Sequence, residues 1–320
     1  MTQNKELFLE KQSTGLIVKS VGGRYEMITD SGERLACYAR GAFRYQKMKL
    51  LVGDRVSFER EADGSVAVKE ILPRRNALIR PPLANTDMIF AVISAGFPAP
   101  DLLLTDKLIT IAEYSHIRPV LVVTKQDQDE RSAARIEEIY RKCGLDVFVT
   151  SSTEKRGITE LLQFIRTECP GKVSAVAGVS GAGKTSLLNV LFEGLSLATG
   201  ELSARIERGK NTTRHVELFA VGDLLPGMDP DLPEGYIADT PGFSLIDFTR
   251  FDFYKKEDLP FTFREFAPYL GKCRYTKCSH TKEQGCAVLA AVSDGIIPPE
   301  RHASYCAIYA DLKDKHDWDS

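Results

Sequence analysis

The alternation of hydrophobic and polar positions changes twice along the chain. From residue 14 to about residue 72, short runs alternate apolar with polar residues, and turn residues such as Gly22-Gly23 and Asp63-Gly64 separate them. Strands are predicted at residues 15–18, 25–28, 33–37, 54–58 and 66–71. This pattern favours a small closed barrel of the OB type, although a different small barrel would show the same alternation.

Continuous apolar runs replace the alternation after residues 73–82, a stretch that resembles a basic linker. Runs at residues 88–93, 120–123 and 147–149 are typical of buried parallel strands, and helical patterns over 102–114 and 132–143 separate them. Beyond about residue 247, only helical stretches are predicted, at residues 263–270, 287–293 and 299–313. We therefore expect three domains: an OB-type β-barrel (1–73), an α/β domain (74–247) and an α-helical domain (248–320).

A candidate phosphate-binding loop follows the apolar run at residues 173–177 and precedes a helical stretch. Its residues are Gly178, Val179, Ser180, Gly181, Ala182, Gly183, Lys184 and Thr185, with Ser186 next. This spacing lets backbone N–H groups surround a phosphate at a helix N-terminus. We expect Lys184 to reach the outer phosphate oxygens and Thr185 to place its hydroxyl on Mg²⁺.

Two further segments fit the γ-phosphate side of such a site. Asp239-Thr240-Pro241-Gly242 follows a short apolar run and matches D-x-x-G, in which Asp239 helps to hold Mg²⁺ and the Gly242 N–H meets the γ-phosphate. The polar stretch at residues 209–215 is typical of a switch loop. Thr212 or Thr213, with Thr213 favoured, would complete the Mg²⁺ shell.

The preference for guanine depends on residues that precede the phosphate loop. They are Thr124, Lys125, Gln126 and Asp127, followed after the next strand by Ser151 and Ser152. A carboxylate can accept two hydrogen bonds from the N1–H and N2 amino groups of guanine, which adenine lacks. The Ser151-Ser152 pair can offer a backbone N–H to guanine O6. These motifs follow the phosphate loop in an ordinary GTPase, so their order here predicts a circularly permuted GTPase.

Two other function classes fit part of the same pattern. A P-loop kinase or ATPase would need the phosphate loop but would show no guanine preference. An RNA-binding module would use the nucleotide only to stabilise its fold. Nucleotide competition separates a kinase or ATPase from a GTPase. Turnover of a Lys184→Ala variant separates an RNA-binding module from a GTPase.

A metal site is predicted in the helical region. Cys273, Cys278, His280 and Cys286 lie within 14 residues and supply the donors of a closed structural zinc site. The chain has seven cysteines, and we expect the remaining four to pack as small apolar groups.

Charge and hydropathy indicate the expected partners and the expected location of the protein. The formal net charge is −2, but residues 1–80 carry 15 Lys and Arg against 10 Asp and Glu, a mild tendency to bind polyanions. No apolar run is long enough for a membrane helix, and the first residues lack the apolar core of a signal peptide. We expect a cytoplasmic protein without a membrane partner.

Together these motifs resemble the ribosome small subunit-dependent GTPase A family over nearly the whole chain. The resemblance implies hydrolysis of GTP to GDP and phosphate that is stimulated by the small (30S) ribosomal subunit. It also implies contact with 16S rRNA, a role in late maturation of that subunit, and GTP or GDP, Mg²⁺ and one structural zinc ion as ligands. DNA is not an expected partner, and nothing indicates an obligate dimer, so we expect a monomer.

The chain departs from general GTPase patterns in the guanine motif and at the residues expected to align the attacking water. Thr124 stands where most GTPases have Asn, and Phe243 stands where many have a water-orienting Gln. The family shares the apolar residue and is thought to use a switch-loop His, but Asn211 occupies that place here. We therefore expect Lys184, Asn211 and Gly242 to act in catalysis and intrinsic hydrolysis to be slow, because Asn cannot take up a proton near neutral pH.

Overall fold

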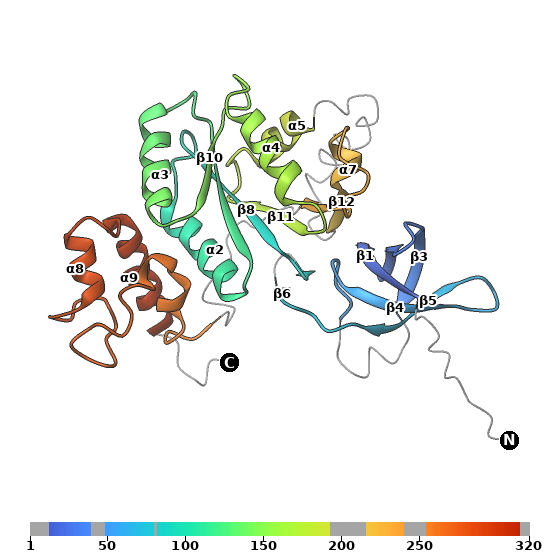
Figure 1. Ribbon diagram of the computed structural model, residues 1–320, viewed down its shortest axis with the longest axis horizontal. Coiled ribbons are helices and arrows are strands. Elements are labelled where there is room, and N and C mark those ends of the chain that lie inside the picture. The colour runs from blue at the N-terminus through green and yellow to red at the C-terminus, as the bar shows by residue number, and fades with distance from the viewer. Residues whose placement is uncertain (1–12, 40–48, 80–81, 193–215, 240–253, 314–320) are drawn as a thin grey trace. The chain divides into compact units, whose positions relative to one another are not determined.

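The computed structural model describes residues 13–39, 49–79, 82–192, 216–239 and 254–313 (Figure 1). The chain divides into two compact units, one of residues 1–85 with 214–218 and one of residues 86–213 with 219–320. The first contains the predicted barrel. The second contains the predicted α/β domain together with the Cys-rich helical region.

The first unit is built on a closed five-stranded barrel. Its strands are β1 (Thr14–Val21), β2 (Arg24–Thr29), β3 (Arg34–Ala39), β4 (Arg55–Arg60) and β5 (Val66–Ile71). Strand β1 pairs with β2 and β4, β2 with β3, and β4 with β5, all antiparallel, while β3 and β5 pair in parallel. The ring closes, and Ile17, Met27 and Val56 are fully buried inside the unit. The predicted OB-type barrel is confirmed.

The stretch expected to be a basic linker belongs to the barrel unit. Arg74 donates two hydrogen bonds, of 2.6 and 2.8 Å, to the carboxylate of Asp54, which is completely buried. A short hairpin of β6 (Ala77–Leu78) and β7 (Leu83–Ala84) follows. The interpretation of this stretch as a linker was therefore incomplete, because one of its charges neutralises a buried acid.

The second unit contains a parallel sheet with helices on both faces. Its strands are β8 (Met88–Ser94), β9 (Arg118–Thr124), β10 (Asp146–Val149), β11 (Val173–Gly178), β13 (Tyr236–Asp239) and the second half of β12 (Glu217–Ala220), whose first two residues are counted with the first unit. Its helices are α2 (Leu102–Tyr114), α3 (Glu130–Lys142), α4 (Ile158–Glu168), α5 (Lys184–Leu191) and α7 (Val221–Leu224). The strand order is β10-β9-β8-β11-β13-β12, and the pairs from β10 to β13 are parallel.

Strands β8, β9 and β11 are buried on both faces along nearly their whole length, which explains their continuous apolar runs in the sequence. Phe90, Val92 and Val122 pack in one core cluster with side chains of α4 and α5. Alternate residues such as Ile89 and Ile93 face the opposite side, where α2 and α3 contact β8 to β10. The predicted α/β architecture is confirmed.

The C-terminal region contains η2 (Leu259–Thr262), η3 (Arg264–Phe266), α8 (Ala287–Ser293) and α9 (Pro299–Lys313). The last two match the predicted helices. The helix expected at residues 263–270 is wrong: Phe263 is an extended residue between the two 3₁₀ turns and Phe266 ends the second, and both rings are buried with their centres 5.2 Å apart. No helix in the described ranges is long and apolar enough to span a membrane.

Candidate nucleotide site and metal cluster

The phosphate loop occupies the centre of the parallel sheet. Strand β11 is buried along its whole length between β8 and β13, and the loop leads from it into α5. Gly183 caps this helix in the left-handed conformation, with a φ of 88°. Loop N–H groups and the helix N-terminus therefore converge at the carboxyl edge of the sheet, where anionic ligands are favoured.

Two residues show how tightly the loop is packed. A Cβ atom added to Gly178 would lie 2.3 Å from the carbonyl oxygen of Val92, so no larger residue fits there. The Nζ atom of Lys184 donates to the carbonyl oxygens of Gly178 and Val179, at 2.7 and 2.8 Å. Its charge is thus held against the loop that would cradle the phosphates. Thr185 and Ser186 are exposed in the first turn of α5.

The candidate guanine motif is bonded directly to this loop. The hydroxyl of Thr124, at the end of β9, donates to the carbonyl oxygen of Ala182 at 2.5 Å. The Nζ atom of Lys125 donates to the carbonyl oxygen of Gly181 at 2.8 Å and also to that of Phe97. Residues more than fifty positions apart in the sequence are therefore hydrogen-bonded to one another.

The candidate base-reading carboxylate is held in place by a serine. The Ser151 hydroxyl donates to an oxygen of Asp127 at 2.6 Å, and Ser151 is fully buried. The Ser151 N–H donates to the carbonyl oxygen of Arg156 at 3.0 Å. Of the two serines expected to offer a backbone N–H, Ser152 is therefore the better candidate. No pattern in the sequence indicated that the Ser151 side chain would orient Asp127.

The γ-phosphate side of the site is only partly described. Asp239 is the last residue of β13 and is in register with Val176 of β11, next to the phosphate loop. Its side chain and the predicted residues Asn211, Thr213 and Gly242 lie outside the described residues. Their roles stay predictions.

The four predicted metal ligands form a compact cluster. The ligand atoms of Cys273, Cys278, His280 and Cys286 all lie within 4.8 Å of one another. The sulfur atoms of Cys273 and Cys286 are 3.8 Å apart, and the Nδ1 atom of His280 is 3.5 and 3.4 Å from them. Two sulfur ligands at about 2.3 Å from a tetrahedral zinc ion are about 3.8 Å apart, so this donor set and its spacing fit one zinc ion.

Neighbouring residues keep this cluster in shape. The His280 carbonyl oxygen lies 2.8 Å from the Nε2 atom of His302, and Tyr305 donates to the carbonyl oxygen of Ser279 at 2.8 Å. Burial lowers the pKa of His280, and neutral imidazole is the form that binds a metal. Helix α9 thus supports the cluster from outside.

A phosphate loop at the centre of a parallel sheet, bonded to a T-K-x-D motif that precedes it in the chain, defines a circularly permuted P-loop GTPase. The model of the RsgA GTPase family matches residues 71–249, and the model of the RsgA N-terminal domain matches residues 14–68. The chain belongs to the RsgA family of GTPases and is an enzyme that hydrolyses GTP.

Relatives and solved structures agree along almost the full length. Two relatives are named small ribosomal subunit biogenesis GTPase RsgA. The protein from Geobacillus sp. (strain WCH70) is 37% identical to this chain, over 94% of this chain and 98% of the relative. The protein from Ruminiclostridium cellulolyticum is 38% identical to this chain, over 94% of each. YjeQ from Thermotoga maritima has a TM-score of 0.75 at 30% identity, covering 95% of this chain and 100% of YjeQ. YloQ, described as a circularly permuted GTPase, has a TM-score of 0.73 at 30% identity, covering 98% and 99%.

Proposed function

We propose that this GTPase binds the small (30S) ribosomal subunit through 16S rRNA and hydrolyses GTP during late maturation of that subunit. The observation that supports a guanine-specific site best is the direct bonding of Thr124 and Lys125 to the phosphate loop, beside the serine-held Asp127. The names of the relatives support the ribosomal role. We expect the protein to act as a cytoplasmic monomer.

Each part of the candidate nucleotide site has a distinct task in this proposal. The loop N–H groups and Lys184 would stabilise the phosphate oxygens, and Asp127 would accept hydrogen bonds from guanine while Ser152 donates to its O6 atom. Thr185, Thr213 and Asp239 would hold Mg²⁺, which neutralises charge on the phosphates. The Gly242 N–H would contact the γ-phosphate.

Contact with rRNA would use the surface around the metal cluster as well as the barrel. Lys272, Lys277 and Lys282 are exposed there. The guanidinium of Arg274 lies 5.6 Å from the ring centre of Tyr275, whose side chain is 51% exposed. Positive charge beside an exposed aromatic ring suits an RNA strand, since the charges pair with phosphates and the ring can stack on a base.

Hydrolysis with and without purified 30S subunits tests the proposal. We expect slow turnover by the protein alone, because Phe243 and Asn211 replace the usual groups that align water, and roughly tenfold or greater acceleration by the subunit. An Asn211→His variant should raise the unstimulated rate. Rapid turnover without subunits that this variant leaves unchanged would contradict the proposed role of Asn211, and an absent response to 30S would contradict the ribosomal role.

Replacing Asp127 with Asn should change base preference. The amide can no longer accept both guanine hydrogen bonds, so GTP affinity should fall by about 1.5–3 kcal/mol, or roughly ten- to a hundredfold. Xanthosine triphosphate should gain affinity, because its C2 carbonyl can accept from the new amide. Titration with fluorescent analogues of both nucleotides measures this, with Asp129→Asn, in the exposed cap of α3, as the control. Equal losses for both nucleotides would indicate damage to the loop instead.

A further inference from the structure

The first residues of the connection from β8 to α2, called here the 95–98 loop, lie between the candidate guanine motif and the phosphate loop. At the start of the 95–98 loop, the Ala95 N–H donates to the carbonyl oxygen of Thr124 at 2.9 Å. At its end, Pro98 lies against the phosphate loop, because a Cβ atom added to Gly181 would be 3.3 Å from the Pro98 Cδ atom. The position of this loop is therefore tied to both halves of the candidate nucleotide site.

Two side chains hold the backbone of Phe97, in the middle of the 95–98 loop. The Nζ atom of Lys125 donates to the Phe97 carbonyl oxygen, and the Oε1 atom of Gln128 accepts from the Phe97 N–H at 2.9 Å. The Phe97 ring takes no part in these contacts and is 83% exposed. The loop is thus fixed through its backbone, by two side chains that lie three positions apart in the chain.

Gln128 fits closely against the loop that it holds. A Cβ atom added to Gly96 would lie 2.2 Å from the Oε1 atom and 2.6 Å from the Cβ atom of Gln128. The Cβ atom cannot swing aside, so the approach of Gln128 requires a glycine at this position. Gln128 also closes the turn that carries the motif, because its N–H donates to the Lys125 carbonyl oxygen at 3.0 Å. Lys125 has a φ of 59°, which is uncommon for a residue other than glycine.

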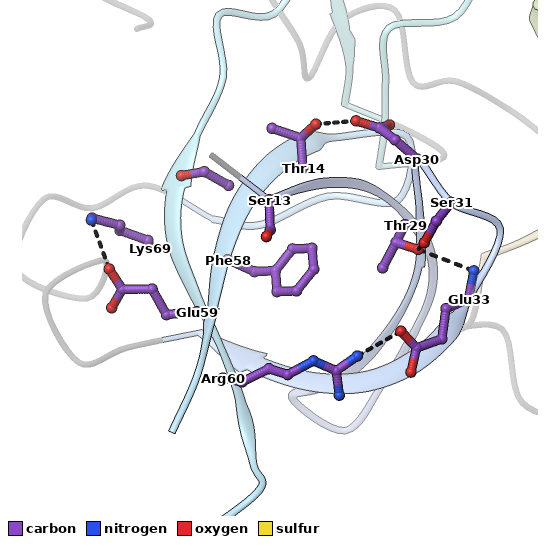
Figure 2. Close-up of a pocket in the computed structure, with 11 residues that line it drawn as sticks. Ser13, Thr14, Thr29, Asp30, Ser31, Glu33, Phe58, Glu59, Arg60 and Lys69 are labelled. Carbon is purple, nitrogen blue, oxygen red and sulfur yellow. Dashed lines mark hydrogen bonds and ion pairs between the residues drawn. The ribbon is translucent and has the colours of Figure 1, made fainter. Parts of the chain in front are cut away.

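These contacts differ in kind from exposed ion pairs elsewhere in the chain. Figure 2 shows such pairs around a pocket of the barrel unit, where Arg60 pairs with Glu33 and Lys69 with Glu59. Each pair joins the ends of two flexible side chains that are about half exposed, and pairs of this kind contribute little to stability. Gln128 instead bonds to a backbone group, so its contact restricts the path of the chain itself.

From this geometry we infer that Gln128 is a positioning residue for Lys125 and that it thereby raises the affinity for the nucleotide. In the proposed guanine site, the methylene stem of Lys125 packs on the face of the base. The 95–98 loop supplies a carbonyl acceptor for the ammonium group, and Gln128 keeps that acceptor in place. The Lys125 side chain therefore loses less conformational entropy when the nucleotide binds. The inference rests on the proposed guanine site and adds a residue that lies outside the T-K-x-D motif.

A Gln128→Met variant of the full-length protein tests the inference, because it keeps the length of the side chain but removes the acceptor. Competition against a fluorescent GDP analogue, with Mg²⁺ present, should show GTP, GDP and inosine triphosphate each binding about three- to tenfold more weakly. The KM for GTP should rise by the same factor while kcat stays within about twofold, because Lys125 contacts the base and not the reacting phosphate.

Inosine triphosphate shows which neighbour Gln128 acts through. This nucleotide lacks the N2 amino group that Asp127 would bond, so its affinity relative to GTP reports on Asp127 alone. We expect that ratio to be the same in Gln128→Met as in the wild type. A loss of the preference for GTP would overturn the inference, because Gln128 would then act through Asp127.

A double-mutant cycle tests the dependence on Lys125 directly. Lys125→Met removes the ammonium group, and in that background Gln128→Met should change GTP affinity by less than about twofold. Gly96→Ala should weaken binding as Gln128→Met does, since the added Cβ displaces the same side chain. The two changes together should lower the affinity by less than the product of their separate factors. If Gln128→Met weakened binding as much without the Lys125 ammonium group as with it, the inference would be wrong.

An exposed glutamine of α4 provides the matched control. Gln163→Met makes the same chemical change on the surface of the same unit and should leave nucleotide affinity unchanged. Without nucleotide, Gln128→Met and the control should unfold within about 2 °C of the wild type. If Gln128→Met binds GTP as tightly as the control does, the inference fails and the proposed function stands. If the wild type binds ATP as tightly as GTP, the proposed guanine site fails, and the inference that depends on it fails too.

Discussion

Replacing Arg301 with Met is expected to lower the free energy of unfolding by about 3–5 kcal/mol at neutral pH. Arg301 belongs to α9 and its side chain is 1% exposed. It pairs with Asp106 of α2 and, at 2.7 Å, with Glu265 of η3. The apolar replacement fills a similar volume but leaves two buried carboxylates without their counter-charge. Urea unfolding monitored by circular dichroism measures the change.

The surroundings of Arg301 explain why the loss should be large. Its guanidinium carbon lies 4.5 Å from the ring centre of Phe263 and 5.5 Å from that of Tyr140, whose hydroxyl donates to Asp106 at 2.7 Å. One cation thus contacts residues from α2, α3 and the 3₁₀ turns. The variant should therefore also loosen the contact between α2 and α9.

The loss caused by Arg301→Met should depend on pH. Burial already raises the pKa of Asp106, and Arg301 counteracts that rise. Without Arg301 the folded-state pKa lies further above the unfolded value of about 3.9, so the folded state binds more protons between the two values and stability falls as pH rises through that range. The variant should be least destabilised near pH 4.

An exposed arginine of the same region provides the control. Arg135 pairs with Glu138 and Glu300, and its side chain is 50% exposed, so Arg135→Met should cost less than about 1 kcal/mol. A combined Arg301→Met, Asp106→Leu and Glu265→Leu variant should recover much of the lost stability, because no buried charge is left unpaired. If Arg301→Met changed stability no more than the control, the network would have no structural role.

Local patterns in the sequence were sufficient for the barrel, the parallel sheet and the metal ligands. Both faces of the strands at residues 88–93 and 120–123 are buried. Their continuous apolar runs therefore indicated buried parallel strands. The four metal donors occupy 14 consecutive residues, where the chain itself limits their separation. Likewise, the phosphate loop shows its fixed Gly and Lys spacing between an apolar strand and a helix, which is a local pattern.

The interactions that sequence analysis missed join residues far apart in the chain. Arg301 lies in a polar helix and is 195 residues from Asp106, so nothing nearby indicated that it would be buried. The hydroxyl of Ser151 orients Asp127, and Arg74 neutralises Asp54, through contacts that form only after the chain folds.

Removing zinc should unfold the segment that carries its ligands. Zinc binding contributes about 10–16 kcal/mol at pH 7 in small structural sites, and the segment from Cys273 to Cys286 has no helix or strand of its own. Chelation, or a Cys278→Ala variant, should expose the amides of this segment and of α8 to hydrogen exchange. Cys306→Ala, outside the cluster, should leave both protected. Elemental analysis should find one zinc per chain in the wild type.

The same experiment shows whether zinc and Arg301 stabilise the same part of the C-terminal region. Tyr305 and His302 of α9 contact residues 279 and 280 of the cluster, and Arg301 adjoins them in the same helix. If α9 couples the metal cluster to the Arg301 ion pairs, chelation and Arg301→Met together should lower the free energy of unfolding by less than the sum of their separate effects. Either change alone would already loosen the helix. The parallel sheet should keep its exchange protection throughout, since its core cluster is built without residues from α8 or α9. Strictly additive losses, or full protection of residues 273–293 after chelation, would contradict this account of the C-terminal region.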